Sequence, residues 1–190
     1  PGMPSSPLWS PKLLVGLLAV VVTLAASWVT LRLPETPPAV HRWPTVFLDR
    51  LLGGLANGGP ERYYWGGILV YSALVSALHF GGLQLDVYQT IEQWDTLTHL
   101  LGGGGVAALL YLTFHVETPE RRLRWIVPAV LAIGAGFEIY EFLLKDFWHG
   151  WSLEYYVRDT LLDLVVNMLG SLLVVAGLRI RGVADRSTPR

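Results

Sequence analysis

The sequence predicts an all-α, polytopic membrane helix bundle with about five transmembrane helices. Only 15% of the 190 residues are charged, whereas charged residues make up about a quarter of a typical soluble domain. Hydrophobic residues make up 52% of the chain and gather in long stretches, each close to the roughly 20 residues that span a bilayer. The chain has no cysteine, which excludes disulfides, thiolate metal ligands and a cysteine nucleophile. The net charge of −1 gives no indication of a nucleic-acid partner.

Residues 1–180 are expected to form one bundle. The predicted spans cover residues 13–32, 63–84, 95–115, 125–145 and 159–179. The first stretch could be mistaken for a signal peptide, but only Lys12 precedes it and several arginines follow. A signal peptide needs its positive charge before the apolar run, so a retained helix is favoured.

Three further features concern the parts outside the spans. Segment 41–56, which reads HRWPTVFLDRLLGGLA, mixes bulky apolar with charged residues. It predicts a short helix in the cytoplasmic interface, with a loose loop as the alternative. Residues 181–190 are expected to be a flexible tail. Tryptophans near the span ends are typical of aromatic belts; these are Trp65, Trp94, Trp125, Trp148 and Trp151.

The distribution of basic residues predicts the orientation. With five spans, eleven of the 14 Lys and Arg residues fall on the face that carries the 32–62 loop, the 115–124 loop and the C-terminal tail. Positive residues mark the cytoplasmic side. We therefore expect the N-terminus outside, the C-terminus in the cytoplasm, and a multi-pass location in the cell (inner) membrane.

Ionisable and amide side chains recur on one face of each of the last three spans. Asp95 and His99 are four apart, and Glu138 and Glu141 are three apart. Asp159, Asp163 and Asn167 follow at intervals of four. Residues three or four apart share a helix face. Under the predicted topology all three groups lie at the outer ends of their spans. Acidic residues from three helices are therefore expected at a similar depth in the membrane.

These side chains suggest a metal site, because five carboxylates cannot all stay ionised side by side without compensation. Oxygen ligands with one imidazole suit Mg²⁺, Mn²⁺ or Zn²⁺. The candidate metal ligands are Asp95, His99, Glu138, Asp159, Asp163 and Asn167, and the candidate catalytic residues are His99, Glu141 and Arg158. Protonation of some acids, or pairing with Arg158 and His99, would also reduce the repulsion. Alternatively, these polar side chains could have a purely structural role and form hydrogen bonds that hold the helices together.

Glycines cluster in the same spans. Four consecutive glycines, 102–105, follow His99. Together with Gly134, Gly136 and Gly170 they predict close approach of helix backbones, which would bring the polar faces together. A phosphate-binding loop is the alternative, but such a loop must open a helix, and apolar helix is predicted on both sides.

The order of these motifs resembles that of the VanZ-like superfamily, and most closely its YjdF-type inner-membrane proteins. The resemblance rests on Asp-x3-His at 95–99, Glu-x2-Glu at 138–141, and Arg-Asp-x3-Asp-x3-Asn-x2-Gly at 158–170. It covers about residues 94–171. The superfamily typically has a lysine after the first aspartate and a glutamine at the second motif's end. Here Thr96 and Glu141 stand at those positions, which makes this site more acidic.

Three functions fit these observations. The first is a metal-assisted intramembrane hydrolase or transferase that acts on a lipid or lipid-linked headgroup at the outer leaflet. His99 would be a ligand or an acid/base, Glu141 a base, and Arg158 a stabiliser of anionic charge. The second is a cation- or proton-binding or transport protein. The third is a non-catalytic scaffold whose polar cluster is structural.

Overall fold

The computed structural model describes residues 42–114, 119–144 and 150–187, with six isolated positions (17, 20, 21, 24, 25 and 28) before them. The described chain is helical, which confirms the all-α fold class. The helices are α2 (Trp43–Ala56), α3 (Gly59–Gln84), α4 (Val87–Thr90), α5 (Trp94–Phe114), α6 (Pro119–Leu144) and α7 (Leu153–Ser187). The first predicted span, 13–32, lies outside the described residues apart from those six positions.

Four of these helices, α3, α5, α6 and α7, contain stretches long and apolar enough to cross a membrane. They lie at the positions of the second to fifth predicted spans. Their outward faces carry large exposed apolar side chains, such as Val70 and Leu74 on α3 and Leu173 on α7. Soluble monomers rarely expose contiguous apolar surfaces of this kind. The surface therefore suits contact with lipid.

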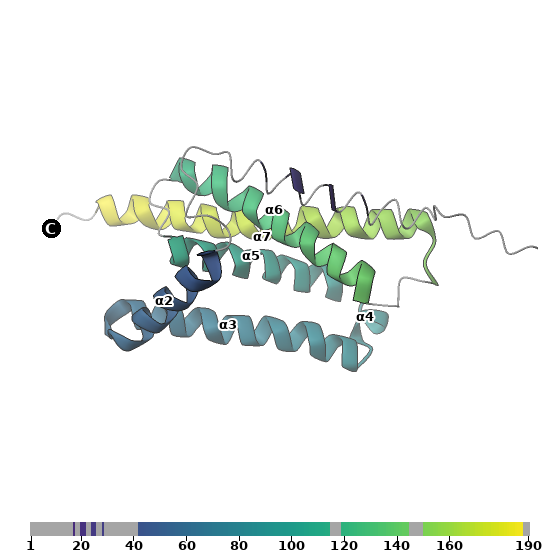
Figure 1. Ribbon diagram of the computed structural model, residues 1–190, viewed down its shortest axis with the longest axis horizontal. Helices are drawn as coiled ribbons and strands as arrows, with labels where there is room; N and C mark the ends of the chain where they lie inside the picture. Colours follow the sequence, from purple (N-terminus) through teal and green to yellow (C-terminus); the bar gives the residue numbers. More distant parts are fainter. Residues whose placement is uncertain are drawn as a thin grey trace, which may run out of the picture.

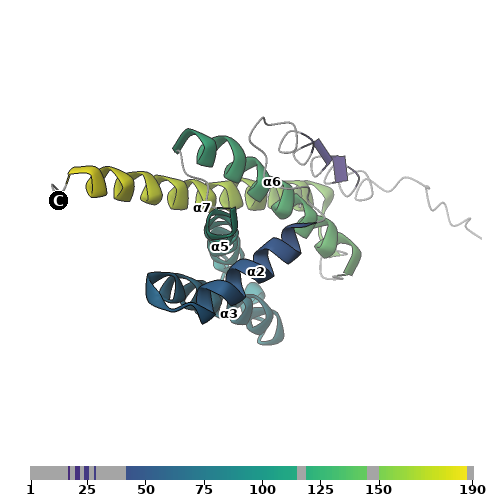
Figure 2. The same ribbon diagram turned by 60° about the vertical axis from the view of Figure 1, so that its left-hand side comes forward.

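In Figure 1 the four long helices all run roughly along the long axis of the view, whereas Figure 2 shows α7 lengthwise and α5 almost end-on, so these two helices cross at an angle. Helix α5 lies between α3 and α7, and α6 packs on both α7 and α5. The short helix α4 lies at one end of the bundle, and α2 lies at the other end, where it crosses α5 and α3 (Figures 1 and 2). That α2 is helical agrees with the segment predicted at 41–56; its position in the membrane interface stays a prediction.

Local sequence explains several helix ends. Pro60 occupies the first turn of α3, where a missing backbone N–H costs no hydrogen bond. After α3, the chain turns at Asp86, whose φ of 55° lies in the left-handed region. Ser152 precedes α7, and its Oγ accepts a hydrogen bond from the Tyr155 backbone N–H at 3.2 Å.

Glycine makes the contact between α5 and α7 possible. A Cβ at Gly103 would collide with the backbone carbonyl of Asn167, and a Cβ at Gly170 would collide with the backbone carbonyl of Leu100. The two backbones therefore touch on both sides of this contact, as the packing interpretation predicts. Gly102 and Gly136 do not take part, because an added Cβ would meet nothing within 4 Å at either position.

An aromatic core fills the end of the bundle near α2. Trp125 is buried and lies edge-on to Trp43 and Phe114, at centroid distances of 5.5 and 5.4 Å. Trp65 is also buried and lies against Gly54 of α2. The prediction that Trp65 and Trp125 belong to aromatic belts is therefore wrong. Their rings face other helices because α2 covers them.

Helix α7 is longer than the sequence predicts. It continues to Ser187, so most of the segment 181–190 is helical rather than a flexible tail. Residues 180–187 contain no proline, and Ala184 and the arginines favour a helix.

Candidate functional site

The candidate polar residues belong to the ends of α5, α6 and α7 that lie beside α4, at the opposite end of the bundle from α2 (Figure 1). Helix α5 begins there, α6 ends there and α7 begins there. The close contact of α5 with α7 sets the spacing, because it lies one to two turns further along both helices. The cluster is therefore built on rigid, directly touching helices rather than on loops.

At its centre lie Asp95 and His99 of α5 and Asp163 of α7. His99 Nε2 is 3.5 Å from Asp95 Oδ1 and 3.7 Å from Asp163 Oδ2. One ligand atom from each of the three residues lies within 4.8 Å of the others. Asp163 is 1% exposed and His99 5% exposed, whereas Asp95 lies partly open at the rim. Three candidate metal ligands thus face one point.

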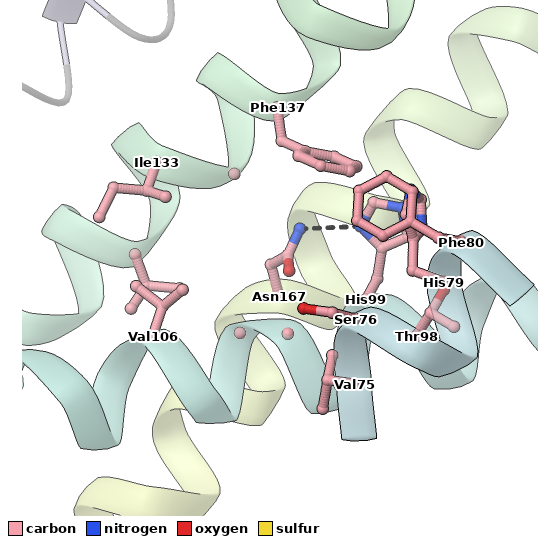
Figure 3. A pocket seen from close by; sticks show the side chains of 14 residues that line it. Val75, Ser76, His79, Phe80, Thr98, His99, Val106, Ile133, Phe137 and Asn167 are labelled. Carbon is pink, nitrogen blue, oxygen red and sulfur yellow. Dashed lines mark hydrogen bonds between the residues drawn. The ribbon is translucent and has the colours of Figure 1, made fainter. Parts of the chain in front are cut away.

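The opposite side of the His99 ring contacts Asn167. The Asn167 side-chain nitrogen is 3.1 Å from His99 Nδ1 (Figure 3). With the amide in this orientation, the nitrogen donates and Nδ1 accepts, so the proton of a neutral His99 lies on Nε2, toward the two aspartates. With the amide turned by half a rotation, its oxygen would accept from Nδ1–H and leave Nε2 with a lone pair. The orientation of the Asn167 amide therefore determines whether His99 Nε2 presents a proton or a lone pair to the two aspartates.

The other predicted acids surround this centre. Glu138 is 4% exposed and lies within electrostatic range of Asp95, Asp159 and Glu141. The same acids act on Asp163. The structure thus brings all five predicted carboxylates into one region. Arg158 is different: it is exposed, and within the described part of the chain it forms no ion pair with these acids.

Two buried carboxylate oxygens stand out. Asp163 Oδ2 and Glu138 Oε1 are inaccessible to solvent and have no hydrogen-bond partner among the described residues. A buried charge without compensation is costly, so each oxygen needs a proton or a cation nearby. The Asp95 carboxylate has no such requirement, because it is about one-third exposed and can be solvated by water.

His79 of α3 also belongs to this region, although its position near a span end suggests an interfacial histidine. It is buried, and its ring lies edge-on to Phe137, at a centroid distance of 5.3 Å. Phe137 contacts the His99 ring in the same way, at 5.9 Å. One phenylalanine of α6 therefore contacts both buried histidines (Figure 3). The spacing within α3 carries no signal of this, because the partners come from other helices.

A chain of hydrogen bonds fixes the proton of His79. Thr98 Oγ1 donates to the Asp95 carbonyl at 2.9 Å. The 3.3 Å contact between Tyr88 Oη and Thr98 Oγ1 must then use the Tyr88 proton. The 2.7 Å contact between His79 Nδ1 and Tyr88 Oη must in turn use a proton on Nδ1. All three contacts are hydrogen bonds only in this one-way arrangement, which leaves His79 Nε2 as an acceptor.

Tyr88 can donate to Thr98 and accept from His79 because its hydroxyl stays protonated. Burial removes the water that would stabilise its phenolate and raises the pKa of Tyr88 to about 12. We expect Tyr88→Phe to shift the proton of neutral His79 from Nδ1 toward Nε2, since the acceptor for Nδ1–H is lost. Imidazole ¹⁵N chemical shifts would report this, with the exposed Tyr63→Phe as control. Identical His79 shifts in all three proteins would refute the hydrogen-bond chain.

Comparison with known proteins gives one match. The model of a family of predicted membrane proteins, DUF2238, matches residues 64–182. No curated protein and no solved structure matches the chain. The matched region extends from α3 through α7 and so includes every helix that contributes to the polar cluster. The YjdF-type proteins, which the last three spans resemble, belong to this family. The chain is therefore an integral membrane protein that belongs to the DUF2238 family.

Proposed function

We propose that the protein is a metal-assisted intramembrane hydrolase or transferase that acts on a lipid or lipid-linked headgroup. The observation that carries this proposal is the buried Asp163 Oδ2, which has no hydrogen-bond partner among the described residues and faces His99 Nε2 at 3.7 Å. Both distances from Nε2 to the aspartates exceed a normal hydrogen bond. A cation between the three groups would compensate both carboxylates.

The donor set fits a small divalent ion. In a tetrahedral site with metal–ligand distances of about 2.0–2.1 Å, ligand atoms lie roughly 3.4 Å apart. The separations from His99 Nε2, 3.5 Å and 3.7 Å, are close to that value. One imidazole with two carboxylates suits Zn²⁺ or Mn²⁺, and a mainly oxygen set with water suits Mg²⁺. Asp95, His99 and Asp163 would hold the ion.

The surrounding residues would have separate roles. With its side-chain oxygen turned toward Nδ1, Asn167 would accept a hydrogen bond from Nδ1–H and leave the Nε2 lone pair for the ion, as an outer partner of a ligating histidine does. Glu138 and Asp159 would be further ligands or would hold a bound water. Glu141, which is partly exposed, would be a general base. Arg158, exposed on the same end of α7, would attract an anionic headgroup. A bound divalent ion supplies Lewis-acid polarisation and lowers the pKa of a coordinated water.

The position in the membrane supports a headgroup substrate. The cluster lies at one end of the apolar helices, and in a bilayer that these helices span this end would lie near the lipid headgroups and glycerol ester linkages. The opposite end carries most of the arginines, so by the positive-inside rule the site would face the outer leaflet of the inner membrane. A relationship to the VanZ-like superfamily would be consistent with a role at the cell envelope.

A second candidate is proton or cation binding. With Asn167 donating to His99 Nδ1, the neutral imidazole holds its proton on Nε2, between two carboxylates. Shortening either Nε2–carboxylate distance to that of a hydrogen bond would let this proton be shared with a carboxylate, and no metal is needed for that. A scaffold whose polar cluster is only structural would have the same hydrogen bonds but no ligand response.

Metal analysis of the purified protein tests the proposal. We expect about one Zn²⁺, Mn²⁺ or Mg²⁺ per chain in the wild type, and loss of the metal in Asp163→Asn, which removes a ligand charge with little change in shape. Asp49→Asn, on the exposed surface of α2, is the matched control and should retain the metal. Melting temperatures would show that all three proteins fold.

The same measurements can also contradict the metal-assisted function. If the wild type contains no metal and its melting temperature does not change on addition of any of the three ions, the metal-assisted function is wrong. The proton-binding and scaffold alternatives would then remain.

A further inference from the structure

A cavity of about 230 Å³ lies beside the polar cluster, between α3, α5 and α6, with Asn167 of α7 contributing to its wall. Its two ends differ in chemistry (Figure 3). His79, His99 and Asn167 line the end near the cluster, and Val106 and Ile133 line the other end (Figure 3); Val130 of α6 also belongs to the lining. The wall is otherwise mostly apolar or glycine. His99 therefore faces Asp95 and Asp163 with its Nε2 edge, and its ring also borders the largely apolar cavity.

The cavity opens between α3 and α6. Helix α3 packs on α5 and α2, whereas it makes little contact with α6. Two lining residues on these helices, Phe80 and Ile133, are largely exposed, at 58% and 42%. The rim therefore lies on the outer surface of the bundle, at a depth where the surrounding medium is hydrocarbon.

The chemistry of the walls selects the occupant. A cavity holds water only where polar partners can bind it, and an apolar cavity of about 150 Å³ accepts a benzene ring instead. The Val106 and Ile133 end offers no polar side chain. The volume exceeds that benchmark but is too small for a whole lipid. It fits a segment of one hydrocarbon chain, whose remainder would stay in the bilayer.

Packing alone would not distinguish such a chain from bulk lipid, because the apolar term that drives burial in water is absent inside a bilayer. Selectivity must come from the polar end. There, His99 and Asn167 could meet a polar group attached to the chain, and this group would lie next to Asp95 and Asp163.

We propose that this cavity binds the first segment of one hydrocarbon chain of a lipid that enters sideways between α3 and α6. The linkage between chain and headgroup then lies at His99, which makes chain-bearing lipids, rather than soluble headgroups, the substrate class. This inference rests on the proposed function for the chemistry at His99, but binding of the chain itself needs no metal.

Gly102 offers a direct test. It lines the cavity, and an added Cβ there meets nothing within 4 Å, so a larger side chain can start into this space without a clash at its first atom. We expect Gly102→Leu to fold normally, since leucine is also a better helix former than glycine. Gly136→Leu is the matched control, because Gly136 also has open space but lies outside the cavity wall. Ile133→Trp is a second variant that blocks the rim.

The probe is phosphatidylglycerol with a photoreactive diazirine in one acyl chain, mixed into phosphatidylcholine vesicles that contain the protein. Labelled residues are identified by mass spectrometry. We expect wild type and Gly136→Leu to be labelled at Val106 and Val130, which lie inside the cavity. Gly102→Leu and Ile133→Trp should lose this labelling while labelling of the exposed face of α7 remains.

Equal labelling of Val106 and Val130 in wild type and Gly102→Leu would overturn the proposal. So would labelling confined to outward-facing residues in the wild type. Metal content of the same samples separates the two proposals. Cavity labelling without metal would leave the chain-binding inference standing and refute the metal-assisted function. Bound metal without cavity labelling would leave the metal-assisted function standing and refute the chain-binding inference.

Discussion

Gly103→Ala is expected to destabilise the protein strongly, by about 3 kcal/mol, the upper end of the usual cost of overpacking. The added Cβ would collide with the backbone of Asn167, from its Cα through its carbonyl. A side chain in the way could rotate, but backbone inside a helix cannot move without shifting α7 as a whole. Thermal unfolding in detergent, followed by circular dichroism, would measure the loss.

Gly102→Ala provides the control for this prediction. It makes the same chemical change one residue earlier on α5, at a position with no atom within 4 Å of the new Cβ. We expect its melting temperature to equal or slightly exceed that of the wild type, because alanine favours a helix by about 1 kcal/mol over glycine. Similar melting temperatures for the two variants would mean that the close contact of α5 with α7 does not stabilise the fold.

Asn167→Asp should increase metal affinity, whereas Asn167→Leu should reduce it by about 10- to 100-fold, the usual effect of losing an outer partner of a metal ligand. A carboxylate at position 167 can only accept from His99 Nδ1–H, which leaves Nε2 with its lone pair toward Asp95 and Asp163. Leucine keeps the approximate volume but cannot orient the ring. Competition with a chelator of known affinity would measure both changes.

The same pair of variants distinguishes a metal site from a polar cluster that only forms hydrogen bonds between helices. If the cluster only joins helices, Asn167→Asp adds a charge beside acids that are already crowded, and it should lower the melting temperature without any metal response. Asn57→Asp, at the exposed end of α2, controls for the added charge. A decrease in metal affinity for Asn167→Asp would contradict the proposed orientation of His99.

Much of the architecture can be predicted from the sequence, because it depends on local properties. A lipid environment requires long apolar helices, and such stretches are visible in the sequence without tertiary information. The shared faces of Asp95 with His99 and of Asp163 with Asn167 follow from the helical repeat alone. The sequence fails where local signals have more than one outcome. Trp125 near a span end can face lipid or the bundle, and only the position of α2 shows that it faces the bundle.

The role of each glycine also needed the structure. Gly102 and Gly103 are adjacent and both line the cavity, yet a Cβ at Gly102 would meet no atom within 4 Å, whereas Gly103 touches the backbone of α7. Successive residues point about 100° apart around a helix, so their environments depend on which neighbour lies on each side.

The sequence by itself determined that this is a helical membrane protein and that three of its helices carry acids, amides and a histidine at one end. Those properties depend on composition and on the helical repeat. Only the tertiary structure decided which groups meet: that His99 faces Asp95 and Asp163 on one edge and Asn167 on the other, and that His79 and His99 both contact Phe137. The physical reason is that contacts between helices depend on their relative rotation and spacing. Here close backbone packing at Gly103 and Gly170 sets both, and residues far apart in the chain contribute to it.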